Sequence, residues 1–296
     1  MITVKNIKKS YGKTAALKGI SFEVGKGELF GIIGPDGAGK TSLFRILTTL
    51  LLADEGTATI DGLEVIRDYK AIRCRVGYMP GRFSLYQDLT VEENLSFFAS
   101  VFGTTIEANY QLIADIYKQI EPFKKRRAGK LSGGMKQKLA LSCALIHKPT
   151  VLFLDEPTTG VDPVSRKEFW QMLRRLQEQN ITILVSTPYM DEAMLCDRIA
   201  LMREGVFLTI DTPSQIVKKF NEPLFAASSG KMSRLLTQLR NMPEVKSSYA
   251  FGDVHHVVLD NTESLSIVKY RLQESGFPDI AMYPITPTVE DCFLKT

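Results

Sequence analysis

The sequence of 296 residues predicts an α/β fold followed by a small α+β domain. Short apolar runs typical of buried strands alternate with segments of helical periodicity over residues 1–220, which favours a parallel sheet. A glycine-rich loop interrupts this alternation at residues 34–42, directly before a helix. Beyond residue 220 the order becomes strand, helix, strand, strand, helix and strand. We therefore expect a separate domain at 221–296 with a split β-α-β arrangement.

The composition is that of an ordinary globular protein with an ample core, with 44% hydrophobic and 24% charged residues. A net charge of +4 is too small to indicate a nucleic-acid partner. No apolar run approaches the ~18 residues that span a bilayer. The opening residues, MITVKNIKKS, are typical of a strand and not of a signal peptide. We therefore expect a cytoplasmic protein whose contact with a membrane is indirect.

The glycine-rich loop GPDGAGKTS, here called the phosphate loop, fits the nucleotide-binding pattern G-x-x-x-x-G-K-[ST]. Gly34 and Gly39 let the backbone turn tightly and aim its N–H groups at phosphate oxygens. Lys40 is placed to reach the β- and γ-phosphates, and the Thr41 hydroxyl to ligate magnesium. The candidate nucleotide-binding residues of this loop are Gly34, Pro35, Asp36, Gly37, Ala38, Gly39, Lys40, Thr41 and Ser42.

The segments on either side of the phosphate loop support this interpretation. Residues 28–33, ELFGII, form an apolar run typical of a strand. The segment after the loop has apolar residues at helical spacing, namely Leu43, Ile46, Leu47 and Leu50. The loop thus precedes a helix N-terminus, where phosphate binding is favoured. A chance glycine-rich loop is the alternative.

A second segment, VLFLDEP at residues 151–157, reads as a buried strand that ends in two carboxylates. Asp155 is the candidate for holding magnesium, and Glu156 for polarising the attacking water as general base. Any strand can end in a solvated acidic turn, so this pattern alone leaves both interpretations open.

The third segment, LSGGMKQ at residues 131–137, is called the signature segment here. It opens a helix whose apolar positions are Met135, Leu139, Leu141 and Leu145. A serine and two glycines at its start indicate a second phosphate-binding helix terminus, although an ordinary Ser-Gly-Gly turn is the alternative. Two such termini and one hydrolytic carboxylate favour a head-to-tail dimer. Each ATP would lie between the phosphate loop of one chain and the signature segment of the other.

With these three segments, residues 1–220 resemble the ATP-binding cassette superfamily. The resemblance implies a P-loop NTPase cassette, which has a RecA-like core, an antiparallel β-subdomain and a helical subdomain at about 86–148. It implies ATP and Mg²⁺ as cofactors, with Thr41 and Asp155 at the metal and Glu156 as the catalytic residue. It also implies a second cassette as partner. The signature residues that would contact its nucleotide are Ser132, Gly133, Gly134 and Gln137.

Two further assignments depend on this resemblance. Tyr11 matches the aromatic residue that stacks on adenine, although a lone tyrosine could equally be ordinary packing. TTGVDP, residues 158–163, matches the loop through which two cassettes signal across the dimer. Within it, Asp162 and Pro163 are also a good N-cap and first residue for the following helix.

Two positions depart from the family pattern. After VGYMP the family usually has a glutamine that touches magnesium and links the nucleotide to the membrane subunit, but this chain has Gly81. After ILVST the family usually has a histidine that holds the γ-phosphate and the attacking water, but this chain has Pro188. Glycine has no side chain, and proline has neither a titratable group nor an N–H.

These departures predict near-normal ATP binding and slow hydrolysis, because loss of an orienting or acid–base group lowers turnover by roughly 10²- to 10⁴-fold. The signature segment is intact, which favours an asymmetric heterodimer with a more complete partner cassette. Retention of Glu156 keeps the alternative open, a symmetric homodimer with slow turnover.

Residues 83–103, FSLYQDLTVEENLSFFASVFG, resemble the corresponding part of prokaryotic ABC-2-type exporter cassettes, which work with separate membrane permease subunits. Residues 221–296 resemble the C-terminal appendage of those cassettes, and TVEDCFLKT resembles its closing helix. His255 and His256 are neighbours on one strand, so we expect them to point to opposite faces without forming a metal site.

The sequence therefore predicts the ATP-binding subunit of a membrane exporter, cytoplasmic and peripheral to the inner or plasma membrane through membrane subunits. One alternative is a soluble cassette ATPase of translation or DNA repair. Such relatives usually carry two cassettes or a long coiled-coil insertion, and neither is present in this sequence. The other alternative is a catalytically silent regulatory cassette.

Overall fold

A computed structural model describes residues 1–82 and 84–295. Phe83, which begins the exporter-like segment, and Thr296, which ends the closing helix segment, lie outside the described residues. The chain contacts divide it into a first unit, Met1–Pro213, and a second unit that begins at Ser214. The sequence predicts this boundary at residue 220. Helix α7 (Pro213–Lys218) explains the difference, because its Ile216 is buried and its carbonyl accepts a hydrogen bond from Cys292 of the second unit.

The first unit is built on a six-stranded sheet in the order β10-β9-β3-β8-β7-β6. Its strands are β3 (Leu29–Ile33), β6 (Val76–Met79), β7 (Val151–Asp155), β8 (Thr182–Thr187), β9 (Arg198–Arg203) and β10 (Val206–Asp211). All neighbours pair in parallel except β9 and β10. β3, β7 and β8 are buried throughout, as expected of parallel strands covered on both faces. Their carboxyl ends meet at one edge of the sheet, which positions the site.

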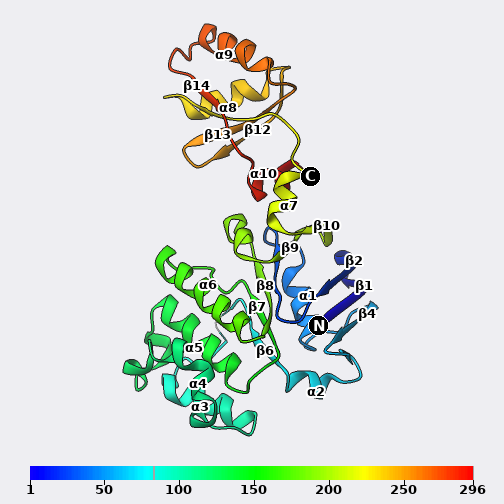
Figure 1. Ribbon diagram of the computed structural model, residues 1–296, viewed down its shortest axis with the longest axis vertical. Helices are drawn as coiled ribbons and strands as arrows, with labels where there is room; N and C mark the ends of the chain where they lie inside the picture. The colour runs from blue at the N-terminus through cyan, green and yellow to red at the C-terminus, as the bar shows by residue number, and fades with distance from the viewer. Residues whose placement is uncertain (83, 296) are drawn as a thin grey trace. The chain divides into compact units, whose positions relative to one another are not determined.

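A second, antiparallel sheet has the order β2-β1-β4-β5. It consists of β1 (Ile2–Tyr11), β2 (Thr14–Val24), β4 (Glu55–Ile60) and β5 (Leu63–Glu64). Its apolar face shares one core with helix α1 (Lys40–Leu47) and with the central sheet, where Phe44 of α1 packs edge-on against Phe153 of β7. Figure 1 shows α6 (Pro163–Glu178) on the other side of the central sheet from α1.

Helix α1 ends at Leu47, although the sequence predicts that it continues through Leu50. Thr49 adopts a left-handed conformation with φ 63°, and the backbone N–H groups of Thr49 and Leu50 donate to carbonyls of the last helical turn. This closure is a Schellman motif, which turns Leu50 out of the helix and into solvent.

The helical subdomain contains α3 (Val91–Val101), α4 (Ile106–Tyr117) and α5 (Gly133–Leu145), within the predicted range of 86–148. A short helix, α2 (Tyr69–Arg73), precedes β6. Thr90 and Glu93 form a capping box at the start of α3. The buried Asn94 side chain donates to the carbonyls of Tyr86, Leu89 and Thr90 and accepts from the Tyr86 N–H. One amide therefore fixes the loop that enters this subdomain.

The second unit has the element order that the sequence predicts (Figure 1). Its elements are β11 (Leu224–Ser228), α8 (Met232–Arg240), β12 (Val245–Phe251), β13 (Val254–Leu259), α9 (Ser264–Glu274), β14 (Ala281–Pro284) and α10 (Val289–Lys295). The strands form an antiparallel sheet in the order β12-β13-β11-β14. Leu235 and Leu239 of α8 and Val268 and Leu272 of α9 fill a core of its own against this sheet.

Candidate functional site

The phosphate loop connects β3 to α1 at the carboxyl edge of the central sheet. The Gly34 N–H donates to the Thr187 carbonyl at the end of β8 (3.2 Å), and the Ala38 N–H donates to the Pro35 carbonyl (3.2 Å). A Cβ atom on Gly34 would lie 2.1 Å from the Met202 carbonyl oxygen, so only glycine fits there. Gly39 has φ 109°, a conformation that glycine adopts without strain. The two glycines of the pattern are therefore required by the backbone path.

Lys40 is the first residue of α1 and is only 3% exposed. Its ammonium group donates to the carbonyls of Gly34 (2.7 Å) and Pro35 (3.0 Å) and forms an ion pair with Glu156 Oε1 at 3.0 Å. Thr41 follows Lys40 in the first turn of α1. Two residues that the sequence assigns to one reaction, Lys40 and Glu156, are thus in direct contact although 116 positions apart.

The two acidic residues differ in environment. Asp155 is buried at the end of β7, and its Oδ1 accepts a hydrogen bond from Ser186 Oγ (2.6 Å) of β8. Glu156 remains 22% exposed at its side chain, and its backbone has φ 51°, an uncommon conformation for this residue type. Its N–H donates to the Ser186 carbonyl at 3.0 Å, which holds this turn in place. One carboxylate is fixed in the protein, and the other remains accessible beside Lys40.

The two residues that depart from the family pattern lie next to these groups. A Cβ atom on Gly81 would lie 3.0 Å from the Asp155 carbonyl oxygen and 3.7 Å from Glu156 Cβ. Pro188 directly follows Thr187, whose carbonyl binds the start of the phosphate loop. Both positions therefore lie beside the acidic residues or the phosphate loop. Whether the two departures slow hydrolysis stays a prediction.

Tyr11, the predicted adenine contact, lies at the end of β1 and is 49% exposed. Its hydroxyl is 3.3 Å from the Ser42 hydroxyl at the end of the phosphate loop. The Lys9 ammonium lies 5.9 Å from the centre of the Tyr11 ring. The structure thus brings an exposed aromatic ring to the phosphate loop, as its predicted role requires.

The signature segment forms the N-terminus of α5. Ser132 is the N-cap, and its hydroxyl accepts a hydrogen bond from the Met135 N–H (3.4 Å). Gly133 and Gly134 begin the helix, and a Cβ atom on Gly134 would lie 2.7 Å from Ser165 Oγ of α6. Gln137 follows one turn later, partly buried. Figure 1 shows α5 and α1 on different sides of the central sheet, so one chain does not bring its signature segment onto its own phosphate loop.

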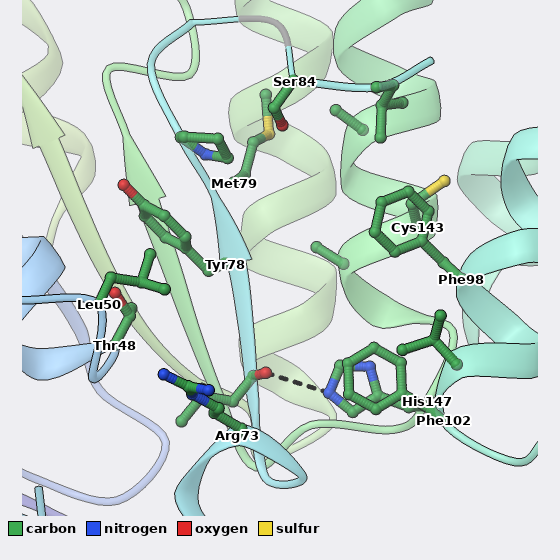
Figure 2. A pocket seen from close by; sticks show the side chains of 16 residues that line it. Thr48, Leu50, Arg73, Tyr78, Met79, Ser84, Phe98, Phe102, Cys143 and His147 are labelled. Carbon is green, nitrogen blue, oxygen red and sulfur yellow. Dashed lines mark hydrogen bonds between the residues drawn. The ribbon is translucent and has the colours of Figure 1, made fainter. Parts of the chain in front are cut away.

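Figure 2 shows a pocket of about 390 Å³ between β6 and the helical subdomain. The Phe102 and His147 rings stack in it with centroids 3.8 Å apart, and His147 Nε2 hydrogen-bonds to the Val76 carbonyl. Burial lowers the pKa of His147, which favours the neutral ring. Tyr78 lines the same pocket, and burial together with the nearby Asp155 charge raises the pKa of Tyr78 to about 12. The pocket also includes Pro80, which directly precedes Gly81.

One charged residue near the site, Glu192, is not predicted by any motif of the sequence. It lies in a short helical turn after β8 and is 1% exposed. Its carboxylate accepts hydrogen bonds from the hydroxyls of Thr158 and Thr187. The sequence offers no local signal for these contacts, because Thr158 is 34 residues away.

The fold and this site define a nucleotide-binding cassette, and comparisons with known proteins agree. The family model for ABC transporters matches residues 17–159. The Nod factor export ATP-binding protein I of Rhizobium sp. is 33% identical over 298 residues, covering 99% of this chain and 96% of its own length. The chain therefore belongs to the ABC transporter ATP-binding proteins, a family of ATPases. The predicted family and fold class are confirmed.

Two further proteins are similar to this chain over only part of one of the two lengths. The probable multidrug ABC transporter ATP-binding protein YbhF of Escherichia coli is 40% identical over 272 residues, or 90% of this chain, but the chain spans only 46% of that protein. A dimeric ATP-binding cassette, MJ0796 bound to ADP and phosphate after hydrolysis, superposes with a TM-score of 0.65 at 26% identity. That alignment covers 72% of this chain and 98% of the cassette. Among residues 1–82 and 84–295, no helix is long and apolar enough to cross a membrane.

Proposed function

We propose that the chain is the ATP-binding subunit of a membrane exporter, in which ATP binding and hydrolysis move separate membrane subunits. The observation that carries this proposal is the ion pair between Lys40 of the phosphate loop and Glu156, which directly follows the buried Asp155. A buried cation, a fixed carboxylate and an accessible carboxylate are the groups that phosphoryl transfer to water requires.

The described residues fit a nucleotide with magnesium. The glycine-dependent backbone path and the buried Lys40 fit the phosphates, since both present N–H donors at a helix N-terminus. Thr41 and Asp155 would hold Mg²⁺, which usually takes few protein ligands together with phosphate oxygens. The bound metal supplies positive charge at the phosphates. Glu156 would accept the proton of the attacking water, and Tyr11 would carry the adenine.

A second cassette completes the proposed site. Helix α5, which begins with the signature residues Ser132, Gly133 and Gly134, lies on another side of the central sheet from α1, which follows the phosphate loop (Figure 1). The signature residues can therefore serve a nucleotide only on a partner. The dimeric state of the similar MJ0796 cassette supports this arrangement.

The chain's own hydrolytic site is weakened in this proposal. A glutamine at position 81 would begin 3.0 Å from the Asp155 carbonyl, so its absence leaves the acidic pair without an orienting amide. Pro188 leaves the loop after β8 without a group for the γ-phosphate. The preferred assembly is an asymmetric heterodimer, in which the intact signature segment serves a more complete partner. A homodimer with slow turnover is the competing assembly.

Membrane permease subunits of the ABC-2 type are the proposed partners on the cytoplasmic face of the inner or plasma membrane. Names of relatives that include Nod factor export and daunorubicin resistance support export. The pocket in Figure 2 is the proposed contact surface, because it is lined largely by apolar side chains and includes Pro80, directly before Gly81. A permease segment seated there would contact the loop next to the acidic pair.

The test compares ATP binding and steady-state phosphate release for the unaltered chain and for Gly81→Gln combined with Pro188→His. We expect ATP binding to stay the same and turnover to rise by roughly 10²-fold, the effect of a restored orienting group. Gly81→Ala with Pro188→Ala is the matched control, because it makes the same backbone changes without the functional groups. An ordinary cassette rate in the unaltered chain would contradict the weakened site. Absence of ATP binding would contradict the function.

A further inference from the structure

The Glu192 carboxylate joins two segments that frame the proposed reaction centre. Its Oε1 accepts a hydrogen bond from Thr158 Oγ1 at 2.7 Å, and its Oε2 accepts one from Thr187 Oγ1 at 2.5 Å. Thr158 lies two residues after Glu156, and Thr187 directly precedes Pro188. One side chain therefore bonds to the turn of the candidate general base and to the strand end before the altered position.

Both threonine hydroxyls donate to the carboxylate of residue 192. Thr187 Oγ1 accepts from the Tyr189 N–H at 3.1 Å and donates its own proton to Glu192. Thr158 Oγ1 also donates. A carboxylate satisfies both hydroxyls at once, whereas a glutamine of the same size offers one acceptor and one donor.

Both joined segments continue into the site. The Thr159 N–H donates to the Glu156 carbonyl (3.2 Å), so the Thr158 turn holds the backbone of the candidate base. The Thr187 carbonyl accepts from the Gly34 N–H (3.2 Å) at the start of the phosphate loop. Movement of either threonine would therefore shift a group that acts on the nucleotide.

Arg166 of α6 supplies the charge that compensates this buried carboxylate. Its Nε lies 3.6 Å from Glu192 Oε1, and its guanidinium stacks 4.2 Å from the centre of the Tyr189 ring. Asp191, the residue before Glu192, also pairs with Arg166 at 3.7 Å but is mostly exposed and bonds neither threonine. Burial of a carboxylate is costly unless it is paired and hydrogen-bonded. Glu192 meets both conditions, and its oxygens are used to join the two segments.

We propose that Glu192 is a positioning residue for ATP hydrolysis, which fixes the Glu156 turn against the end of β8 and the phosphate loop. This inference rests on the proposed ATPase function. The Glu192 carboxylate would hold the strand end at Thr187 in place, directly before Pro188, which itself has no functional group for the nucleotide. Glu192 acts through Thr158 and Thr187 and makes no contact with the nucleotide in this proposal.

The test is single-turnover hydrolysis of radiolabelled ATP by an excess of the full chain, measured beside the Kd for MgATP. We expect Glu192→Gln to lower the rate roughly 10- to 100-fold, as loss of a hydrogen bond to a charged group would. The Kd should stay within about 3-fold, because Lys40 and the loop backbone are unchanged. Asp191→Asn is the matched control and should retain both values, since Asp191 bonds neither threonine.

Thr158→Val and Thr187→Val test the connection itself and keep the buried carboxylate. Each should slow hydrolysis, and each should add little in combination with Glu192→Gln, because partners in one network are not additive. Should Glu192→Gln fail to fold, these two variants still decide the matter. Unchanged rates in them, or equal losses of rate and affinity, would overturn the positioning role. A chain that binds MgATP without a single turnover, both unaltered and with Gly81→Gln combined with Pro188→His, would instead overturn the proposed ATPase function, and this inference with it.

Discussion

Each unit of the molecule buries a charged cluster, but the two clusters differ in what their oxygens contact. In the second unit, Asp291 of α10 is 0% exposed. Its Oδ1 accepts from Tyr249 Oη (2.5 Å) and bonds to His256 Nδ1 (2.6 Å), and its Oδ2 accepts from the Thr288 N–H and hydroxyl. In the first unit, the Glu156 carboxylate contacts Lys40 and stays partly open to solvent. A carboxylate is a candidate for chemistry when at least one of its oxygens can still accept a hydrogen bond from a ligand or a water.

The Asp291 cluster accordingly stabilises the fold of the second unit, since both carboxylate oxygens are already hydrogen-bonded. Burial raises the pKa of Asp291, but the hydrogen bonds from Tyr249, His256 and Thr288 outweigh it and hold that pKa below its ordinary value. Burial, together with the hydrogen bond to Asp291, raises the pKa of Tyr249. A carboxylate bonded in this way attaches α10 to strands β12 and β13, which carry Tyr249 and His256.

The largest expected effect is at Glu156, where Glu156→Gln should lower ATP turnover by about 10³-fold, because an amide cannot act as general base. Stability should fall only modestly, because the amide oxygen can still accept from the buried Lys40 ammonium, which also donates to the Gly34 and Pro35 carbonyls. Phosphate release and thermal unfolding of the same preparation measure both quantities. Glu178→Gln, an exposed change at the end of α6, is the control. Retained turnover in Glu156→Gln would contradict a catalytic role for the charged cluster of the first unit.

Asp291→Asn should have the opposite profile. The amide leaves at least one buried donor of the cluster without an acceptor, so we expect the second unit to lose about 2 kcal/mol of stability. ATP affinity should stay the same, because the proposed nucleotide-binding residues lie in the first unit. Unfolding in urea, monitored through the fluorescence of a probe attached to one residue of α10, measures this loss of stability. Asp253→Asn, in the exposed turn between β12 and β13, should have no effect. A fall in ATP affinity would show that the two clusters are not independent.

Local patterns predicted the parts of the site that depend on backbone path. The phosphate loop and the signature segment each combine a strand or a loop with a helix N-terminus, and spacing alone locates both. The ends of β7 and β8 follow from apolar runs that stop at polar residues. Because parallel strands end at a common edge, these predictions also placed Asp155 and Glu156 near Lys40.

Contacts between distant segments could not be predicted in this way. Glu192 follows β8 in a short turn, and nothing in its neighbourhood specifies Thr158 as a partner. His256 shows the same limit, because its partner Asp291 is 35 residues away on α10. The predicted course of α1 failed for a local reason, the left-handed Thr49, which apolar spacing does not register. Periodicity thus indicates which face is buried but not which residue covers it.

The smallest effect is expected at Tyr11. Stacking of a base on an aromatic side chain is worth about 1–3 kcal/mol, and a half-exposed ring belongs at the low end. Tyr11→Ala should therefore weaken MgATP binding by about 5-fold, whereas Tyr11→Phe, which keeps the ring, should bind normally. Tyr270→Ala removes an exposed ring from α9 of the second unit and should leave the Kd unchanged. Competition of ATP against a fluorescent analogue measures all three values. If Tyr11→Phe weakens binding as much as Tyr11→Ala, the contribution belongs to the hydroxyl contact with Ser42 rather than to stacking, and Tyr11 acts by holding the phosphate loop.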